Sequence, residues 1–456
     1  MTGRTILRKE LLPLILGAMI MMLLAFYDGY PIVTNDSGTY ISCAFTGEIP
    51  SDRPVFYSWF IRISSLGQSM WLTVGAQSLI LSYLLLRLVR WLLPGISQQH
   101  STALFLLFSL GTIGGWYSSQ LMPDVFTPVL CLALLLFLLD KQNSRRTALY
   151  AVLILLSSVM HNAHPIILTL FTLLLAIAFL FKRTSFLRLR GLIALAGLSA
   201  GAWVSLCLVN ASAGNGFRPS KATHVFLVGK LAESGLLESY LDKVCPSKDY
   251  KLCAYKDSLP VAAFSFVWDG NSPVNKTGGW DANNQEYSHI LGDMATSPRF
   301  YPMMVYKSLE ATARQLTQIN IDESYALSWT VFDASTPPYQ SIARFVPHEK
   351  NAFHTSRQNE KTLSISLYDK TYAWVFLLST LAVLFGYRYL PTGARLVYTL
   401  LITLIVLNAF STATFANILP RLNSRVVWLL PACNLIMTYY AIRLRLSSKD
   451  NLPTWQ

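Results

Sequence analysis

Long apolar runs are the feature that most constrains what this chain can fold into. Apolar residues make up 53% of the sequence and charged residues only 13%. The apolar residues gather in runs that approach the ~20 residues an α-helix needs to cross the core of a bilayer. The sequence therefore predicts an all-α polytopic membrane protein.

About ten runs are expected to span the membrane. The first, 11–27, follows Arg4, Arg8 and Lys9 but lacks a small-residue cleavage site, so we interpret it as a retained helix rather than a removed signal peptide. Several runs are shorter than a full span, so the count is approximate. The other expected spans are 70–86, 102–115, 125–139, 148–160, 166–181, 192–209, 372–385, 396–415 and 426–442.

Basic residues predict the orientation, because Lys and Arg near span ends remain cytoplasmic. They concentrate in alternate connections and in the tail, so both termini are expected inside the cell. The other connections, including 28–68 and 210–370, are then expected outside. The expected location is a bacterial inner membrane with its functional site facing the periplasm or exterior. The basic residues are Arg87, Arg90, Lys141, Arg145, Arg146, Lys182, Arg183, Arg188, Arg190, Arg388, Arg395, Arg443, Arg445 and Lys449.

The net charge of +13 does not indicate nucleic-acid binding. Residues 210–370 contain 16 basic and 16 acidic side chains, which leaves 21 basic and 8 acidic ones elsewhere, mostly at the expected cytoplasmic edges. The excess therefore reflects membrane topology and attraction to anionic lipids.

Three regions are predicted: a seven-span module (1–209), an exoplasmic domain of mixed structure (210–370), and a three-span module with a cytoplasmic tail (371–456). Within the middle region, 297–316 has apolar positions at helical spacing and could lie along the membrane surface. Cys245 and Cys253 are its only cysteines, and an oxidising compartment favours a disulfide between them. The alternative is two free thiols.

The first outer loop (28–68) has the densest polar chemistry near the membrane. Asp36 lies in the turn-forming segment NDSG, and Asp52 and Arg53 precede Pro54 and an aromatic segment that predicts an interfacial helix. Ionisable groups next to the membrane are functional candidates. In the structural alternative, Asp36 caps a helix and Arg53 neutralises Asp52.

Two shorter outer connections add further candidates. Asp124 follows Pro123 at the start of an apolar run, where it either caps the helix or lines an outward-facing cavity. His161 and His164 form a His-x-x-His pair, a weak metal signal without a third ligand, so polar closure of a helical hairpin is the favoured interpretation.

The last outer connection places Arg421 and Arg425 on the side where positive charge is disfavoured. This exception indicates an anionic partner. A guanidinium suits a phosphate because it donates in a planar fork and remains charged. Pairing with an outer-loop carboxylate is the alternative.

Together these motifs resemble the GT-C superfamily of integral membrane glycosyltransferases, which includes protein O-mannosyltransferases and the lipid A aminoarabinose transferase. The shared features are the early outer acid in TNDSGTY, the interfacial helix in RPVFYSWF, the Pro-acid pair in MPD and the late arginine in SRVVWLLPA. The chain differs in having one acid at Asp36 rather than an Asp-x-Asp pair.

The resemblance implies transfer of a sugar from a polyprenyl-phosphate donor to a glycan, lipid or protein acceptor on the outer face. Asp36 would act as general base, and Arg425 with Arg421 would stabilise the departing phosphate. Asp124 would orient the acceptor or help hold a divalent ion, while Asp52, Arg53 and His161 would contact substrate. No cofactor is otherwise indicated. The alternatives are a transporter or flippase for lipid-linked glycans, a polysaccharide polymerase, and a non-catalytic assembly subunit.

Overall fold

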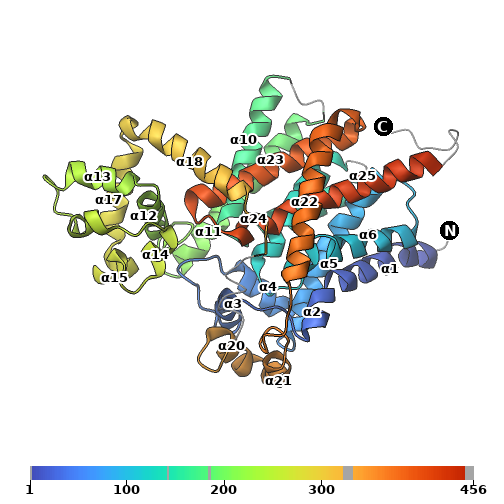
Figure 1. The fold of residues 1–456 in the computed structure, drawn as a ribbon, viewed down its shortest axis with the longest axis horizontal. Helices are drawn as coiled ribbons and strands as arrows, with labels where there is room; N and C mark the ends of the chain where they lie inside the picture. The colour runs from blue at the N-terminus through green and yellow to red at the C-terminus, as the bar shows by residue number, and fades with distance from the viewer. Residues whose placement is uncertain (1–2, 141–142, 183–185, 322–331, 447–456) are drawn as a thin grey trace.

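The computed structural model describes residues 3–140, 143–182, 186–321 and 332–446. Over these ranges the protein is built from helices and turns without any strand, and Ile32 and Gln120 form an isolated parallel bridge. Figure 1 shows the longer helices gathered beside a group of short ones that includes α12, α13, α14, α15 and α17.

The first half of the chain contains both long and short helices. Their bounds are α1 (Gly3–Met21), α2 (Leu23–Asp28), α3 (Asn35–Thr46), α4 (Phe56–Ser64), α5 (Met70–Leu92), α6 (Gln98–Leu110), α7 (Gly114–Ser118), η1 (Pro123–Val125), α8 (Phe126–Leu139), α9 (Ser144–Ser158), α10 (Ala163–Leu180) and α11 (Leu189–Ser212).

The second half begins with short helices and ends with long ones. The bounds are α12 (Thr223–Glu233), α13 (Leu236–Val244), η2 (Lys251–Ser258), α14 (Ala263–Trp268), α15 (Pro273–Lys276), α16 (Gly279–Ala282), α17 (Asn284–Ala295), η3 (Pro298–Phe300), α18 (Tyr301–Leu316), α20 (Pro337–Phe345), η4 (Pro347–Glu349), α21 (Lys350–His354), α22 (Ser366–Gly386), η5 (Tyr387–Tyr389), α23 (Thr392–Phe415), α24 (Pro420–Val427) and α25 (Leu429–Leu446).

Six helical stretches among the described residues are long and apolar enough to cross a membrane. Two further apolar helices, Leu11–Met21 and Pro123–Leu139, are shorter. The helical class predicted from the apolar runs is confirmed, whereas ten spans, their orientation and an exoplasmic position for 210–370 remain predictions. The six are Met70–Leu92, Ala163–Leu180, Leu189–Ser212, Ser366–Tyr389, Thr392–Phe415 and Pro420–Arg445.

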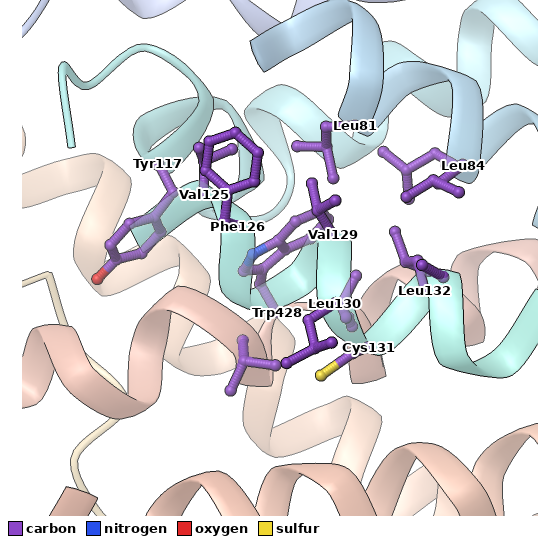
Figure 2. Close-up of a cluster of buried hydrophobic side chains, with 14 of the residues drawn as sticks. Leu81, Leu84, Tyr117, Val125, Phe126, Val129, Leu130, Cys131, Leu132 and Trp428 are labelled. Atoms are coloured by element: carbon purple, nitrogen blue, oxygen red, sulfur yellow. The ribbon is translucent and has the colours of Figure 1, made fainter. Parts of the chain in front are cut away.

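Helix α8 lies at the centre of the largest core. Every residue from Phe126 to Leu138 is buried, as expected for a helix that is apolar on all sides and must be surrounded by others. It packs against α5 and α9, and Figure 2 shows Trp428 among its side chains. Because Trp428 immediately follows α24, this packing fixes the end of the helix that carries Arg421 and Arg425.

The short helices between α12 and η3 enclose a separate core that includes Val225, Leu237, Phe266, Tyr287 and Phe300. The expected mixed structure for this region is wrong, because its described residues form helices and turns only. These helices run from 3 to 12 residues between turns, which is too short for helical periodicity to stand out in the sequence.

Residues 332–365 pack with the N-terminal part rather than with this second core. Ser341 Oγ donates to the Gly38 carbonyl at 2.9 Å, and the rings of Phe45 and Phe345 stack at 4.8 Å. A Cβ at Gly38 would lie 2.5 Å from the backbone of Pro337, so glycine permits the close approach of α20 to α3. The predicted 210–370 domain is therefore divided between two cores.

Candidate functional site

Asp36 lies in the first turn of α3, but it does not cap the helix. Thr34 is the N-cap, and its backbone N–H donates to Ser37 Oγ at 2.9 Å as part of a capping box. Ser37 Oγ donates in turn to the Leu121 carbonyl at 2.9 Å, which ties α3 to the connection before Asp124. The carboxylate of Asp36 is thus left to bind other groups, at a helix end where negative charge is favoured.

Two arginines from distant parts of the chain share the Asp36 carboxylate. Arg53 Nη1 lies 2.8 Å from Asp36 Oδ1, and Arg421 Nη2 lies 2.9 Å from Asp36 Oδ2. The side chains of Asp36 and Arg421 are 27% and 30% exposed, so this ion cluster is open to solvent on one side. Each guanidinium uses one carboxylate oxygen, which makes Asp36 a bridge between Arg53 and α24.

Arg53 is held by a second carboxylate as well. Its Nε and Nη2 donate to Asp52 Oδ2 at 3.0 and 2.7 Å, and its guanidinium lies over the Tyr40 ring, 5.4 Å from the centroid. Asn162 anchors this loop by donating to the Asp52 carbonyl at 2.9 Å. Arg53 therefore neutralises Asp52, as one sequence interpretation proposed, and contacts Asp36 at the same time.

The electrostatics keep Asp36 ionised. Burial favours its neutral form, but the guanidinium groups of Arg421 and Arg53 outweigh that effect and hold its pKa well below the usual range. A carboxylate whose pKa is lowered in this way accepts a proton only weakly. Its basicity would rise if another anion took over the guanidinium groups.

Asp124 and Arg425 form a buried pair. Arg425 Nη1 lies 3.1 Å from Asp124 Oδ1, and Arg425 Nη2 donates to Asn408 Oδ1 at 3.3 Å. The Arg425 side chain is fully buried and that of Asp124 is 4% exposed, while Nε of Arg425 has no hydrogen-bond partner. Arg425 is thus enclosed, and Arg421 is the arginine of α24 that reaches the exposed cluster.

Helix α24 joins the buried pair to the exposed cluster. Arg421 and Arg425 are four residues apart on this helix, so their side chains lie one turn apart on one face. Tyr40 lies near both the exposed cluster and the buried pair. Burial raises the pKa of its phenol, Arg53 opposes the shift, and Asp36, Asp52 and Asp124 add to it. The acids from the two early connections and the arginines from α24 therefore converge on one region.

His161 lies beside this region as a neutral imidazole. Burial lowers its pKa, and the positive charges of Arg425, Arg421 and Arg53 are among the causes that lower it further. His161 Nδ1 accepts a hydrogen bond from the Ala163 backbone N–H at 3.1 Å. The ring proton must then be on Nε2, which makes this histidine a hydrogen-bond donor at that atom rather than a base.

His164 has a structural role. Its Nδ1 donates to the Ser157 carbonyl at 2.7 Å, and its Nε2 accepts from Thr127 Oγ1 at 2.7 Å. Nδ1 therefore bonds within the hairpin of α9 and α10, and Nε2 ties that hairpin to α8. Nowhere in the described ranges do three His, Cys, Asp or Glu side chains gather closely enough to hold a metal ion.

Comparison with known proteins gives no match. No family model, curated protein or solved structure matches this chain. The resemblance to GT-C glycosyltransferases therefore depends on the short motifs alone, and function must be argued from the geometry of the site.

Seven predicted site residues meet in this region, whereas the predicted disulfide lies elsewhere. Cys245 and Cys253 are bonded in the second core, with their Cα atoms 5.6 Å apart. His161 lies beside six residues that form direct ion pairs: Asp36, Asp52, Arg53, Asp124, Arg421 and Arg425.

Three participants were not predicted from the sequence. Tyr40 lies one helical turn after Asp36, a spacing that indicates a shared face. Asn408 interrupts an apolar run, and a polar residue there is itself a signal of function or packing. Tyr117 contacts the hydroxyl of Ser424 and the carbonyl of Arg421, 3.4 Å away, but nothing local in the sequence distinguishes it from the other tyrosines of the chain.

Proposed function

We propose that this protein is a membrane glycosyltransferase that moves a sugar from a polyprenyl-phosphate donor to an acceptor at the outer face. The observation that supports the proposal best is the sharing of Asp36 by Arg53 and Arg421 in a partly exposed cluster. Two guanidinium groups paired with the two oxygens of one carboxylate provide both a phosphate site and a base. Such a pair of functions is what transfer from a sugar phosphate requires.

The phosphate of the donor binds Arg53 and Arg421 and displaces the Asp36 carboxylate from them. The displaced carboxylate loses its two stabilising cations, so its affinity for a proton rises. It then takes the proton of the acceptor hydroxyl as the acceptor oxygen bonds to the anomeric carbon. The bond from that carbon to the phosphate oxygen breaks, and its electron pair stays on the phosphate, where the two arginines stabilise the charge.

The buried pair positions the reactive arginine. Arg425 and Asp124 hold α24 against the α8 region, and Trp428 Nε1 donates to the Arg425 carbonyl at 3.0 Å. Arg425 has no exposed atoms for a substrate, so its role in this proposal is to fix the position of Arg421. This assignment differs from the one implied by the family resemblance.

The test uses purified protein in detergent, polyprenyl-phosphate hexoses labelled in the sugar, and a cell-envelope extract as acceptor. Transfer of label without a sealed membrane supports an enzyme, because net transport needs two compartments. Asp36→Asn is expected to abolish transfer, whereas the matched change Asp242→Asn in an exposed ion pair with Lys256 is expected to leave it unchanged. Absence of transfer by the wild type, or full activity of Asp36→Asn, would contradict the proposal.

A further inference from the structure

A cavity of about 260 Å³ lies where the first outer loop meets the second core. It is lined by Ser51, Lys221, Ala222, Gly278, Trp280 and Asp281. Its volume is just below the range of ~300–1,000 Å³ that is usual for small-molecule sites, so it suits a ligand about the size of one sugar residue.

An aromatic group with a fixed plane forms one part of this cavity. The Trp280 ring packs edge-on against Trp268, with centroids 5.1 Å apart and an interplanar angle of 64°, and against Phe226 at 5.9 Å and 69°. The Trp280 carbonyl also accepts a hydrogen bond from His224 Nε2 at 2.9 Å. These contacts hold the indole before any ligand arrives, which lowers the entropic cost of binding.

The charged groups of the cavity balance each other. Lys221 Nζ lies 2.7 Å from Asp281 Oδ2, and the two side chains are 30% and 71% exposed. The ammonium group supplies donors and the carboxylate supplies acceptors, both of which can be turned toward ligand hydroxyls. Because the pair carries no net charge, it favours a neutral polyhydroxyl ligand over an anion or a cation.

The backbone leaves space next to the indole. Gly278 and Gly279 adopt φ angles of 110° and 83°, a left-handed conformation that side chains other than glycine rarely accept. A Cβ built at Gly279 would have no atom within 4 Å. A Cβ at Gly278, the glycine that lines the cavity, would lie 3.0 Å from Ala282 Cβ, so the open space at this turn is on the Gly279 side.

The cavity and the ion cluster use adjacent residues of the sequence, Ser51 and Asp52. The Ser51 carbonyl accepts hydrogen bonds from the Ala222 backbone N–H at 3.0 Å and from Ser220 Oγ at 3.1 Å. Ser51 precedes Asp52, whose carboxylate pairs with Arg53. A group bound in the cavity is thus held beside the loop that contacts Asp36.

From these features we infer that the cavity binds a neutral pyranose residue, with an apolar sugar face on Trp280 and hydroxyl groups on Lys221 and Asp281. The sugar belongs either to the acceptor glycan or to the donor. This inference deepens the proposed function and rests on it for the role of the sugar, but the binding itself is measured without transfer.

The binding test applies saturation-transfer NMR to the full chain in detergent with the methyl glycosides of glucose, galactose, mannose and N-acetylglucosamine. At least one glycoside is expected to bind, and Trp280→Ala is expected to weaken it about tenfold through loss of the aromatic surface. Trp374→Ala is the matched control, because that side chain is 66% exposed on α22. Asp281→Ala, at an exposed position, is also expected to weaken glycoside binding, and it tests the inference if Trp280→Ala fails to fold.

Binding of none of the four glycosides, or binding that survives both substitutions, would overturn the inference. In the transfer assay, a higher KM of Asp281→Ala for the acceptor alone assigns the sugar to the acceptor, and a higher KM for the donor alone assigns it to the donor. Glycoside binding combined with full transfer by Asp36→Asn would leave the sugar site standing and remove the proposed catalytic base.

Discussion

Asp36→Asn is expected to tighten the binding of a phosphate while it abolishes catalysis. The carboxylate of Asp36 occupies the guanidinium groups of Arg53 and Arg421, at 2.8 and 2.9 Å, that the proposed donor phosphate must use. The asparagine side chain is neutral and similar in shape. It removes the competing charge and leaves both arginines in place.

The size of the effect follows from the charges. The displaced Asp36 carboxylate and the phosphate that replaces it on the guanidinium groups would lie ~4 Å apart, and unit charges at that distance repel by ~4 kcal/mol at an effective dielectric constant of ~20. Asp36 is 27% exposed, so solvent and salt screen part of this repulsion. We expect a net gain of about 1.4 kcal/mol, which corresponds to about tenfold tighter binding.

The assay is calorimetric titration of farnesyl phosphate into the protein in detergent at pH 7, at low and high salt. The gain should shrink as salt increases, because the repulsion it removes is electrostatic. Asp242→Asn provides the control, since it neutralises a carboxylate that pairs with Lys256 at 2.8 Å in the second core. Unchanged or weaker binding by Asp36→Asn would refute the idea that Asp36 competes with phosphate for the arginines.

Three further predictions concern stability, measured by unfolding in detergent. Arg425→Met should cost ~3–5 kcal/mol because it leaves Asp124 buried and uncompensated, and a double variant with Asp124→Leu should recover most of that loss; no recovery would contradict this account. Replacing Cys245 and Cys253 by serine should lower the stability of the second core by ~2–3 kcal/mol, as seen by hydrogen exchange, because the loop they close is short. Burial raises the pKa of Asp28 from 3.8 to about 6 despite a hydrogen bond from the Gln358 backbone N–H. The folded state therefore binds the proton more tightly than the unfolded state, and it loses stability as the pH rises from 3.8 to about 6. Asp28→Asn should therefore stabilise the protein by ~3 kcal/mol at pH 7 and by little at pH 4, and equal gains at both pH values would contradict the burial argument.

Local sequence patterns predicted much of the helical framework but little of its division into domains. Apolar runs indicated the long helices, because an apolar helix surface must be buried and this requirement does not depend on which helix packs against it. The short helices between α12 and η3 were missed, since turns interrupt them before a period can be recognised. The packing of α20 on α3 was also missed, because it depends on close approach at Gly38, a distant contact that local periodicity does not encode.

The sequence by itself determined which residues are chemically unusual: acids and arginines beside apolar helices, and two cysteines eight positions apart. Only the tertiary structure decided their partners. It joined Asp36 to Arg421 across 385 positions, exposed that arginine, and enclosed Arg425 with Asp124. The physical reason is that helix formation and hydrophobic burial follow from local pattern, whereas the strength and access of an ion pair depend on how separate helices dock.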